Sequence, residues 1–174
     1  STAMAAVAAS STAMAAVAKS PVAVAAIWKS TTAVQKVQAN STAWATFTGV
    51  SSAVIGKAAA ILAGLNPDSY ADMTAVAASS TAMAAVAASS TAMAAVAKSP
   101  VAVAAIWKST TAVQKVQANS TAWATFTGVS SAVIGKAAAI LAGLNPDSYA
   151  DMTAVAASST AMAAVAASST AMAA

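Results

Sequence analysis

Residues 10–19 read Ser-Ser-Thr-Ala-Met-Ala-Ala-Val-Ala-Lys, and variants of this ten-residue unit follow one another along most of the chain. The fourth position of the unit is almost always Ala, the fifth is usually large and apolar, and the eighth is Val or a similar residue. No motif of a catalytic or ligand-binding site interrupts the pattern. Successive units begin at Ser10, Ser20, Ser30, Asn40, Val50 and Ala60, and after a nine-residue unit they resume at Ser69 and Ser79.

Positions four, five and eight have the spacing of one face of an α-helix. A single long helix does not suit this repeat, because ten residues turn through about 1000° and leave the apolar stripe roughly 80° behind in each unit. Pro21 directly after Ser20 is typical of an N-cap followed by the first helical residue. Lys19 and Lys29 precede the next Ser, where a cation favours a helix C-terminus. We therefore predict one two-turn helix of about seven or eight residues per unit.

Helices this short are unstable alone in water, so they must stack. The sequence predicts an all-α repeat solenoid in which short helices form antiparallel pairs, with Trp44, Phe47 and Val34 in its core. The alternative is an oligomeric coiled-coil fibre. Its disadvantage is an apolar spacing of about 3.3 residues, far from the roughly 3.5 that a left-handed supercoil requires.

A second, longer repeat encloses the first. The sequence from Ser1 to Ala95 is identical to the sequence from Ser80 to Ala174. The chain thus divides into a first unit (1–79), an identical second unit (80–158) and the start of a third (159–174), with an arbitrary phase. Eight decapeptide segments per unit predict eight helices, so that every unit begins on the same layer. We expect the chain to be a slice of a longer array.

Composition excludes several classes of function. Only 7% of the 174 residues are charged, and the chain contains no His, Cys, Arg or Glu. A Ser-His or Cys-His nucleophile pair and a zinc site of the usual kind therefore cannot form within it. The net charge of +4 comes from dispersed Lys residues, which do not make the basic stripe of a nucleic-acid-binding protein. So few charges cover a monomer poorly, which favours self-association.

One segment gathers all the acidic side chains of the unit. Residues 64–72 read Gly-Leu-Asn-Pro-Asp-Ser-Tyr-Ala-Asp and recur at 143–151. Oxygens of Asn66, Asp68, Ser69 and Asp72 could bind Ca²⁺. The favoured interpretation is a turn that leads into a helix, with Asp72 near the positive helix terminus, because the spacing is not that of an EF-hand loop.

The remaining aromatic and glycine residues fit structural roles. Trp44 and Phe47 occupy core positions of their units, whereas Trp28 lies at position nine and is the better candidate for a contact with another chain. Gly49, Gly56 and Gly64 have no phosphate-loop spacing, so helix packing or termination is expected. We predict no enzyme activity, no cofactor, no small-molecule substrate and no catalytic, cofactor-binding or metal-binding residues. The uncharged run 73–97 includes seven Ser or Thr residues, which argues against a membrane span.

The repeated Ser-Ser-Thr-Ala-Met-Ala-Ala-Val-Ala-Ala resembles the Ala/Ser/Thr-rich tracts of tail-fibre and related structural proteins of tailed bacteriophages. The resemblance lies in composition and covers most of the chain. It implies a shaft or spacer in an extracellular or virion fibre, formed by a homo-oligomer or filament, and it assigns no functional residue. The alternative function is a binding surface in which a ladder of Ser and Thr recognises ice or a hydroxylated polymer.

Overall fold

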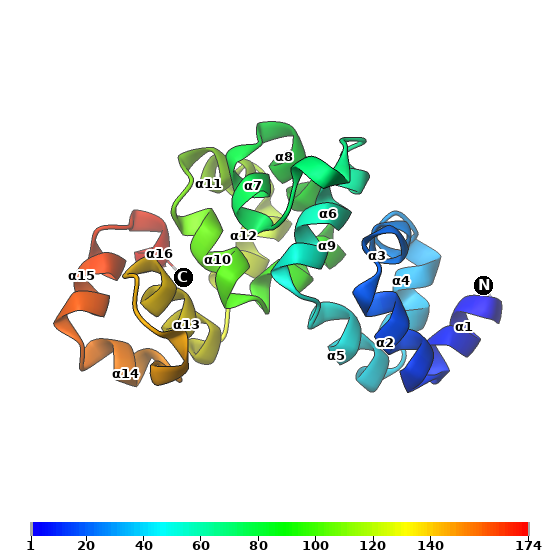
Figure 1. Ribbon diagram of the computed structural model, residues 1–174, viewed down its shortest axis with the longest axis horizontal. Coiled ribbons are helices and arrows are strands. Elements are labelled where there is room, and N and C mark those ends of the chain that lie inside the picture. The colour runs from blue at the N-terminus through cyan, green and yellow to red at the C-terminus, as the bar shows by residue number, and fades with distance from the viewer. Residues whose placement is uncertain (1, 174) are drawn as a thin grey trace.

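The computed structural model describes residues 2–173, and all regular structure in that range is helical (Figure 1). The fold is therefore all-α, as predicted. Its elements are α1 (Thr2–Ala9), α2 (Ser11–Lys19), α3 (Pro21–Trp28), α4 (Thr31–Gln38), α5 (Ser41–Thr48), α6 (Ser52–Leu62), η1 (Pro67–Ser69), α7 (Met73–Ala78), α8 (Ser80–Ala88), α9 (Ser90–Ala97), α10 (Pro100–Trp107), α11 (Thr110–Gln117), α12 (Ser120–Thr127), α13 (Ser131–Leu141), η2 (Pro146–Ser148), α14 (Met152–Ala156), α15 (Ser159–Ala166) and α16 (Ser169–Ala173).

The first residue of most decapeptides caps the helix that follows it. Ser20 adopts an extended conformation, and its hydroxyl oxygen accepts a hydrogen bond from the Ala23 N–H at 3.3 Å. Pro21 is the first residue of α3, where its missing N–H costs nothing. Asn40 caps α5 in the same way, with its side-chain oxygen 3.0 Å from the Ala43 nitrogen. The predicted capping pattern is confirmed, and Asn joins Ser in this role.

Consecutive helices are connected so tightly that the chain bends without reversing. Ser20 alone separates α2 from α3, and the two helices meet at 101°. The same residue ends one helix and caps the next, because its N–H donates to the Val17 carbonyl while its side chain caps α3. Antiparallel helix pairs are usually joined by loops of about two to five residues. The predicted antiparallel pairing is therefore wrong for the four pairs of consecutive helices that meet at 88° to 102°.

The packing partner of a helix is usually the third helix along the chain. In the first unit α1 packs on α4, α2 on α5 and α3 on α6, and in the second α8 packs on α11, α9 on α12 and α10 on α13. Helices three places apart in the chain therefore stack on each other in both units. The bends of 88° to 102° also exclude a continuous coiled-coil helix over the bent pairs.

The regular order is interrupted once in each unit. The predicted helix starts at Val50, Ala60 and Ser69 are wrong: α6 begins after its cap Ser51 and runs through Ala60 to Leu62. Among residues 2–158 each unit therefore contains seven α-helices, not eight, with α1–α7 in the first and α8–α14 in the second. After the break, α7, α8 and α9 all pack against α6. α9, the counterpart of α2, packs on α5, which in turn packs on α2, so the second unit continues the stack of the first.

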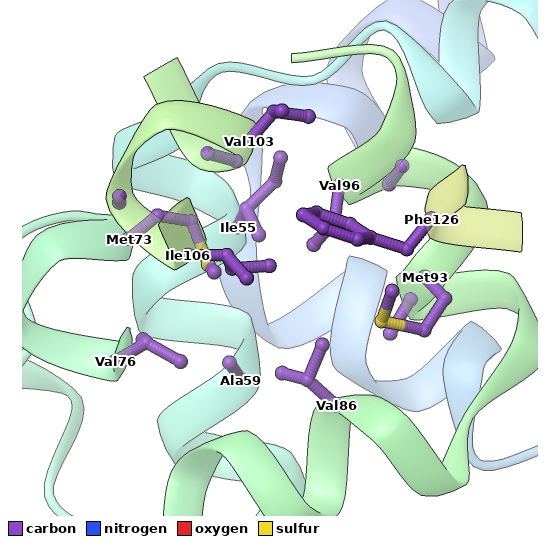
Figure 2. Packing of buried hydrophobic residues seen from close by; sticks show 14 of the residues in the cluster. Ile55, Ala59, Met73, Val76, Val86, Met93, Val96, Val103, Ile106 and Phe126 are labelled. Carbon is purple, nitrogen blue, oxygen red and sulfur yellow. The ribbon is translucent and has the colours of Figure 1, made fainter. Parts of the chain in front are cut away.

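The core is continuous through the junction between the units. Figure 2 shows side chains from the first unit, including Ile55 and Met73, packed with Val86, Met93 and Ile106 of the second. All five are fully buried. In Figure 1 the helices follow one long direction, with α1–α5 at one end, α13–α16 at the other and α6–α12 between them. Apolar contact between units therefore joins the two halves of the chain.

The core predictions are only partly correct. Phe47 and Val34 are buried, as expected, but Trp44 is half-buried. Trp28, expected to remain available for another chain, is only 6% exposed. The decapeptide position alone does not decide burial, because the start of the next unit covers Trp28.

None of the helices within residues 2–173 is by itself long and apolar enough to cross a bilayer. Four pairs of consecutive helices reach that length and composition only together, and each pair is bent by 88° to 102°.

Candidate functional site

The acidic segment forms a turn that ends α6 and starts α7. Gly64 has a φ of 73°, a left-handed conformation that glycine adopts without steric cost and that commonly ends helices. The Leu65 N–H then donates back to the Ala60 carbonyl at 2.8 Å. Asn66 accepts a hydrogen bond from the Asp68 N–H at 3.0 Å and opens a short 3-10 turn. The predicted turn is confirmed.

Three of the four side chains considered for Ca²⁺, those of Asn66, Asp68 and Asp72, make other contacts. Asp72 caps α7 and accepts hydrogen bonds from the N–H groups of Thr74 and Ala75 at 2.8 and 3.3 Å. Asp68 lies 4.0 Å from the exposed Lys57 ammonium, and the equivalent pair in the second unit is separated by 3.6 Å. Within residues 2–173 no three carboxylate, His or Cys side chains gather. The segment therefore orders the chain between two helices.

The turn folds back tightly onto α6. A Cβ added to Gly56 would lie 2.6 Å from the Asp72 carbonyl carbon, so only glycine allows this approach. Ser52, at the start of α6, accepts a hydrogen bond from the Met73 N–H at 3.2 Å. The Tyr70 hydroxyl donates to the Ser79 hydroxyl oxygen at 3.3 Å and so links the turn to the cap of α8. Gly56 thus has the packing role predicted for it, and the turn directs the chain into the next unit.

Trp28 lies beside a hollow at the junction of the units. The hollow has a volume of about 320 Å³ and is lined from the first unit by Trp28, Thr31 and Leu62, and from the second by residues 88–91. A second hollow, of about 250 Å³, is lined in the same way by Trp107 and by residues 167–170. The indole N–H groups of Trp28 and Trp107 are buried without a hydrogen-bond partner among the described residues. Both tryptophans therefore mark equivalent junctions.

The other aromatic residues do not join Trp28. Trp44 and Phe47 contact each other on α5, with ring centroids 6.3 Å apart, and Tyr70 lies on the turn. The structure therefore does not bring the sequence-selected aromatic residues together as one binding surface. Gly49 ends α5 and Gly64 ends α6, as predicted.

Two polar contacts cross between the units and were not foreseen. The Lys98 ammonium donates to the Thr48 hydroxyl oxygen at 2.7 Å, and the Ser109 hydroxyl donates to the Ala77 carbonyl at 2.6 Å. Thr48 is fully buried. The two partners of each contact belong to different units, so a decapeptide pattern could not pair them. Their common signal is their position near helix ends, where side chains meet the next layer.

Several contacts of the first unit recur in the second. The Lys29 ammonium donates to the Ile61 carbonyl at 3.0 Å, and the Lys108 ammonium to the Ile140 carbonyl at 3.3 Å. The equivalents of the Met73–Ser52 and Tyr70–Ser79 contacts are present in the second unit at 3.1 and 3.2 Å. Each unit therefore repeats the same contacts between its own helices and its turn. Hydroxyls, ammonium groups and backbone groups make these contacts.

Comparison with known proteins gives no matching family model, no matching curated protein and no matching solved structure.

Proposed function

We propose that the chain is a structural repeat protein that forms the shaft or spacer of an extracellular or virion fibre. The observation that supports this function is the repetition of the junction. Lys29 and Lys108 make the same contact in successive units, and α13, α14 and α15 pack together as α6, α7 and α8 do. Each added unit extends the array by the same step.

The chemistry of the junction suits a passive spacer. Its buried contacts are apolar side chains of both units, supplemented by the Lys98–Thr48 and Ser109–Ala77 hydrogen bonds. Such contacts join the units through the protein's own side chains and backbone. We propose no enzyme activity, because the repeated contacts orient helices and bring no nucleophile next to a base.

A ladder of Ser and Thr that binds ice or a hydroxylated polymer is the competing proposal. The side-chain oxygens of Ser10, Ser20 and Ser30 accept hydrogen bonds from backbone N–H groups, so these atoms stabilise helix starts. Helix capping is thus a structural role for these Ser side chains that requires no ligand. Thermal hysteresis measured on the purified chain separates the proposals, because a clear effect at micromolar protein would favour the binding surface.

The spacer function can be tested by changing the number of units. Chains extended by one and by two further repeat units are compared with the original chain by small-angle X-ray scattering and negative-stain electron microscopy. A spacer should lengthen by a constant step per unit at constant cross-section. A radius of gyration that instead follows the slow growth of a compact globule, close to roughly the 0.38 power of chain length, would contradict the proposal.

The matched control is the same series with Gly56 and its equivalents replaced by Ala. That replacement places a methyl group against the Asp72 backbone and should disturb every junction. Loss of the constant step in the control series alone would show that the junction sets the length.

A further inference from the structure

Thr91 has a hydroxyl that is buried in the protein and yet has no partner there. The residue is only 5% exposed, and its hydroxyl makes no hydrogen bond among the described residues. Within residues 2–173, among side chains that are not exposed, the fully enclosed unpartnered nitrogen and oxygen atoms are the indole nitrogens of Trp28 and Trp107. The Thr91 oxygen therefore keeps contact with solvent, and Thr91 lines the hollow beside Trp28. A buried hydroxyl that opens onto a hollow indicates a partner from outside the chain.

The same arrangement recurs in the second unit. Thr170, the counterpart of Thr91, is 7% exposed, has no hydrogen-bond partner among the described residues and lines the hollow beside Trp107. The other hydroxyl-bearing residues of the first hollow are likewise replaced by their counterparts 79 residues later. The hollow and its unpartnered hydroxyl therefore belong to the repeat.

Two helices begin at the hollow beside Trp28. Thr31 is the first residue of α4, and Ser90 is the first residue of α9. In each helix the cap hydroxyl accepts the third N–H, so the two N–H groups before it have no acceptor among the described residues. These groups form the positive end of the helix dipole. The first turns of α4 and α9 thus bring hydrogen-bond donors to the same hollow.

Three helices also end at the hollow, and Lys29 offsets their negative potential. These helices are α3, α6 and α8, with Trp28, Leu62 and Ala88 as their last residues. Lys29 is the C-cap of α3, and its ammonium donates to the Ile61 carbonyl of α6 at 3.0 Å. Each helix end carries about half an elementary charge, so two positive ends and one ammonium outweigh three negative ends. None of the described residues that line the hollow is acidic, and the balance favours an anion.

We propose that the hollow binds a small tetrahedral oxyanion, phosphate or sulfate, between the first turns of α4 and α9. The Thr91 hydroxyl and the free N–H groups donate hydrogen bonds to it, and Lys29 contributes its charge from the rim. The volume of about 320 Å³ lies at the lower end of the range for ligand pockets, which suits a small ligand. The hollow beside Trp107 takes a second ion. This binding site goes beyond the spacer function and does not depend on it.

Fluorine NMR of the chain labelled with 5-fluorotryptophan tests the site, because two of the four tryptophans line the two hollows. Replacement of one tryptophan at a time by Phe assigns the four resonances. Titration with sodium phosphate or sodium sulfate should shift the resonances of Trp28 and Trp107 until they saturate, and leave those of Trp44 and Trp123 unchanged. Sodium chloride at the same ionic strength should shift none of them. A linear drift common to all four resonances, or no shift at all, would overturn the proposal.

The double variant Thr91→Val/Thr170→Val removes both hydroxyls and nearly keeps the side-chain shape. It should weaken phosphate binding at least about tenfold, the usual effect of losing a hydrogen bond to a charged group. Thr91→Ser/Thr170→Ser retains the hydroxyls and should bind phosphate as the parent does. Thr32→Val is the matched control, since Thr32 is an exposed residue of α4 that does not line the hollow.

Unchanged phosphate binding in Thr91→Val/Thr170→Val would show that these hydroxyls are not ligands and would reject the site. Titration with glycerol tests the class of ligand. A saturable shift with glycerol as large as that with phosphate would assign the hollow to neutral hydroxylated molecules and overturn the anion site. The constant step per added unit is measured without phosphate or sulfate, so failure of the anion site leaves the spacer function standing.

Discussion

The Lys29 ammonium donates a hydrogen bond to the Ile61 carbonyl, three helices later in the chain, at 3.0 Å. Lys29 is itself the C-cap of α3, and Ile61 lies in the last turn of α6. One cation therefore lies near the negative ends of two stacked helices. This contact shows how a residue at the corner of one layer stabilises the layer above it.

Replacement of Lys29 by Met should lower the free energy of unfolding by about 0.3 to 1 kcal/mol, the usual effect of a cation at an exposed helix C-terminus. The double variant Lys29→Met/Lys108→Met should lose about twice as much, because the two sites are equivalent and distant. Urea unfolding at low and at high salt measures the loss of unfolding free energy in both variants. This loss should be smaller at high salt. A Lys29→Met chain that is as stable as its parent at low salt would contradict the proposed contact.

Replacement of Gly56 by Ala should destabilise the chain by about 1 to 3 kcal/mol, because the new methyl group collides with the Asp72 backbone. Gly64→Ala is the matched control. Its added Cβ meets no atom within 4 Å, so only the cost of a positive φ, about 1 kcal/mol, is expected. The midpoint of thermal unfolding should fall further in Gly56→Ala than in Gly64→Ala. A Gly56→Ala chain as stable as the parent would show that the turn does not pack on α6 as described.

The sequence predicts the local helices well because their signals are local. Ser20 followed by Pro21 marks a helix start regardless of the surroundings, and Gly64 and Asp72 likewise determine their own turn. The length of α6 is harder to predict, since Ala58 to Ala60 continue a helix that the decapeptide pattern would end. The direction taken after each helix depends on the backbone angles of the few connecting residues. Those angles place the third helix, and not the second, against the first.

The emission wavelength of each tryptophan should depend on its burial in the structure and not on its position in the decapeptide. A chain that retains only Trp28 and Trp107, with Phe at positions 44 and 123, should emit at shorter wavelength than the reverse variant. The reason is that Trp28 and Trp107 are each 6% exposed, whereas Trp44 and Trp123 are half-buried. Acrylamide quenching should rank the two variants in the same order. The opposite order would indicate that Trp44 is more deeply buried than Trp28.

Burial of Trp28 could not be predicted from its own decapeptide, because its cover comes from the start of the next unit. The Lys98–Thr48 contact could not be predicted for the same reason, because its two residues belong to different units. No motif in the sequence therefore predicted the contacts at the junction. The junction itself is a property of two units packed together, and no short motif encodes it.

Replacement of the cap residue Ser20 by Ala should cost about 1 kcal/mol, because the Ala23 N–H loses its acceptor. Ser11, the first residue of α2, is exposed, and its side chain makes no hydrogen bond among the described residues. Ser11→Ala should therefore change the free energy of unfolding by less than about 0.5 kcal/mol. Chemical denaturation of the two variants measures the difference. Equal losses would indicate that Ser20 does not act as a cap.

The stacking of short helices is tested most directly by the distance between equivalent residues of the two units. Val22 and Val101 lie at the same place on α3 and α10, and both are exposed. Spin labels on Val22→Cys/Val101→Cys, diluted with unlabelled chain, report this distance by pulsed electron paramagnetic resonance. Stacked helices spaced about 8 to 10 Å per layer predict roughly 20 to 40 Å, including the label linkers. A continuous helix would separate these two positions by about 118 Å, so a distribution lying beyond about 60 Å would contradict the stacked fold.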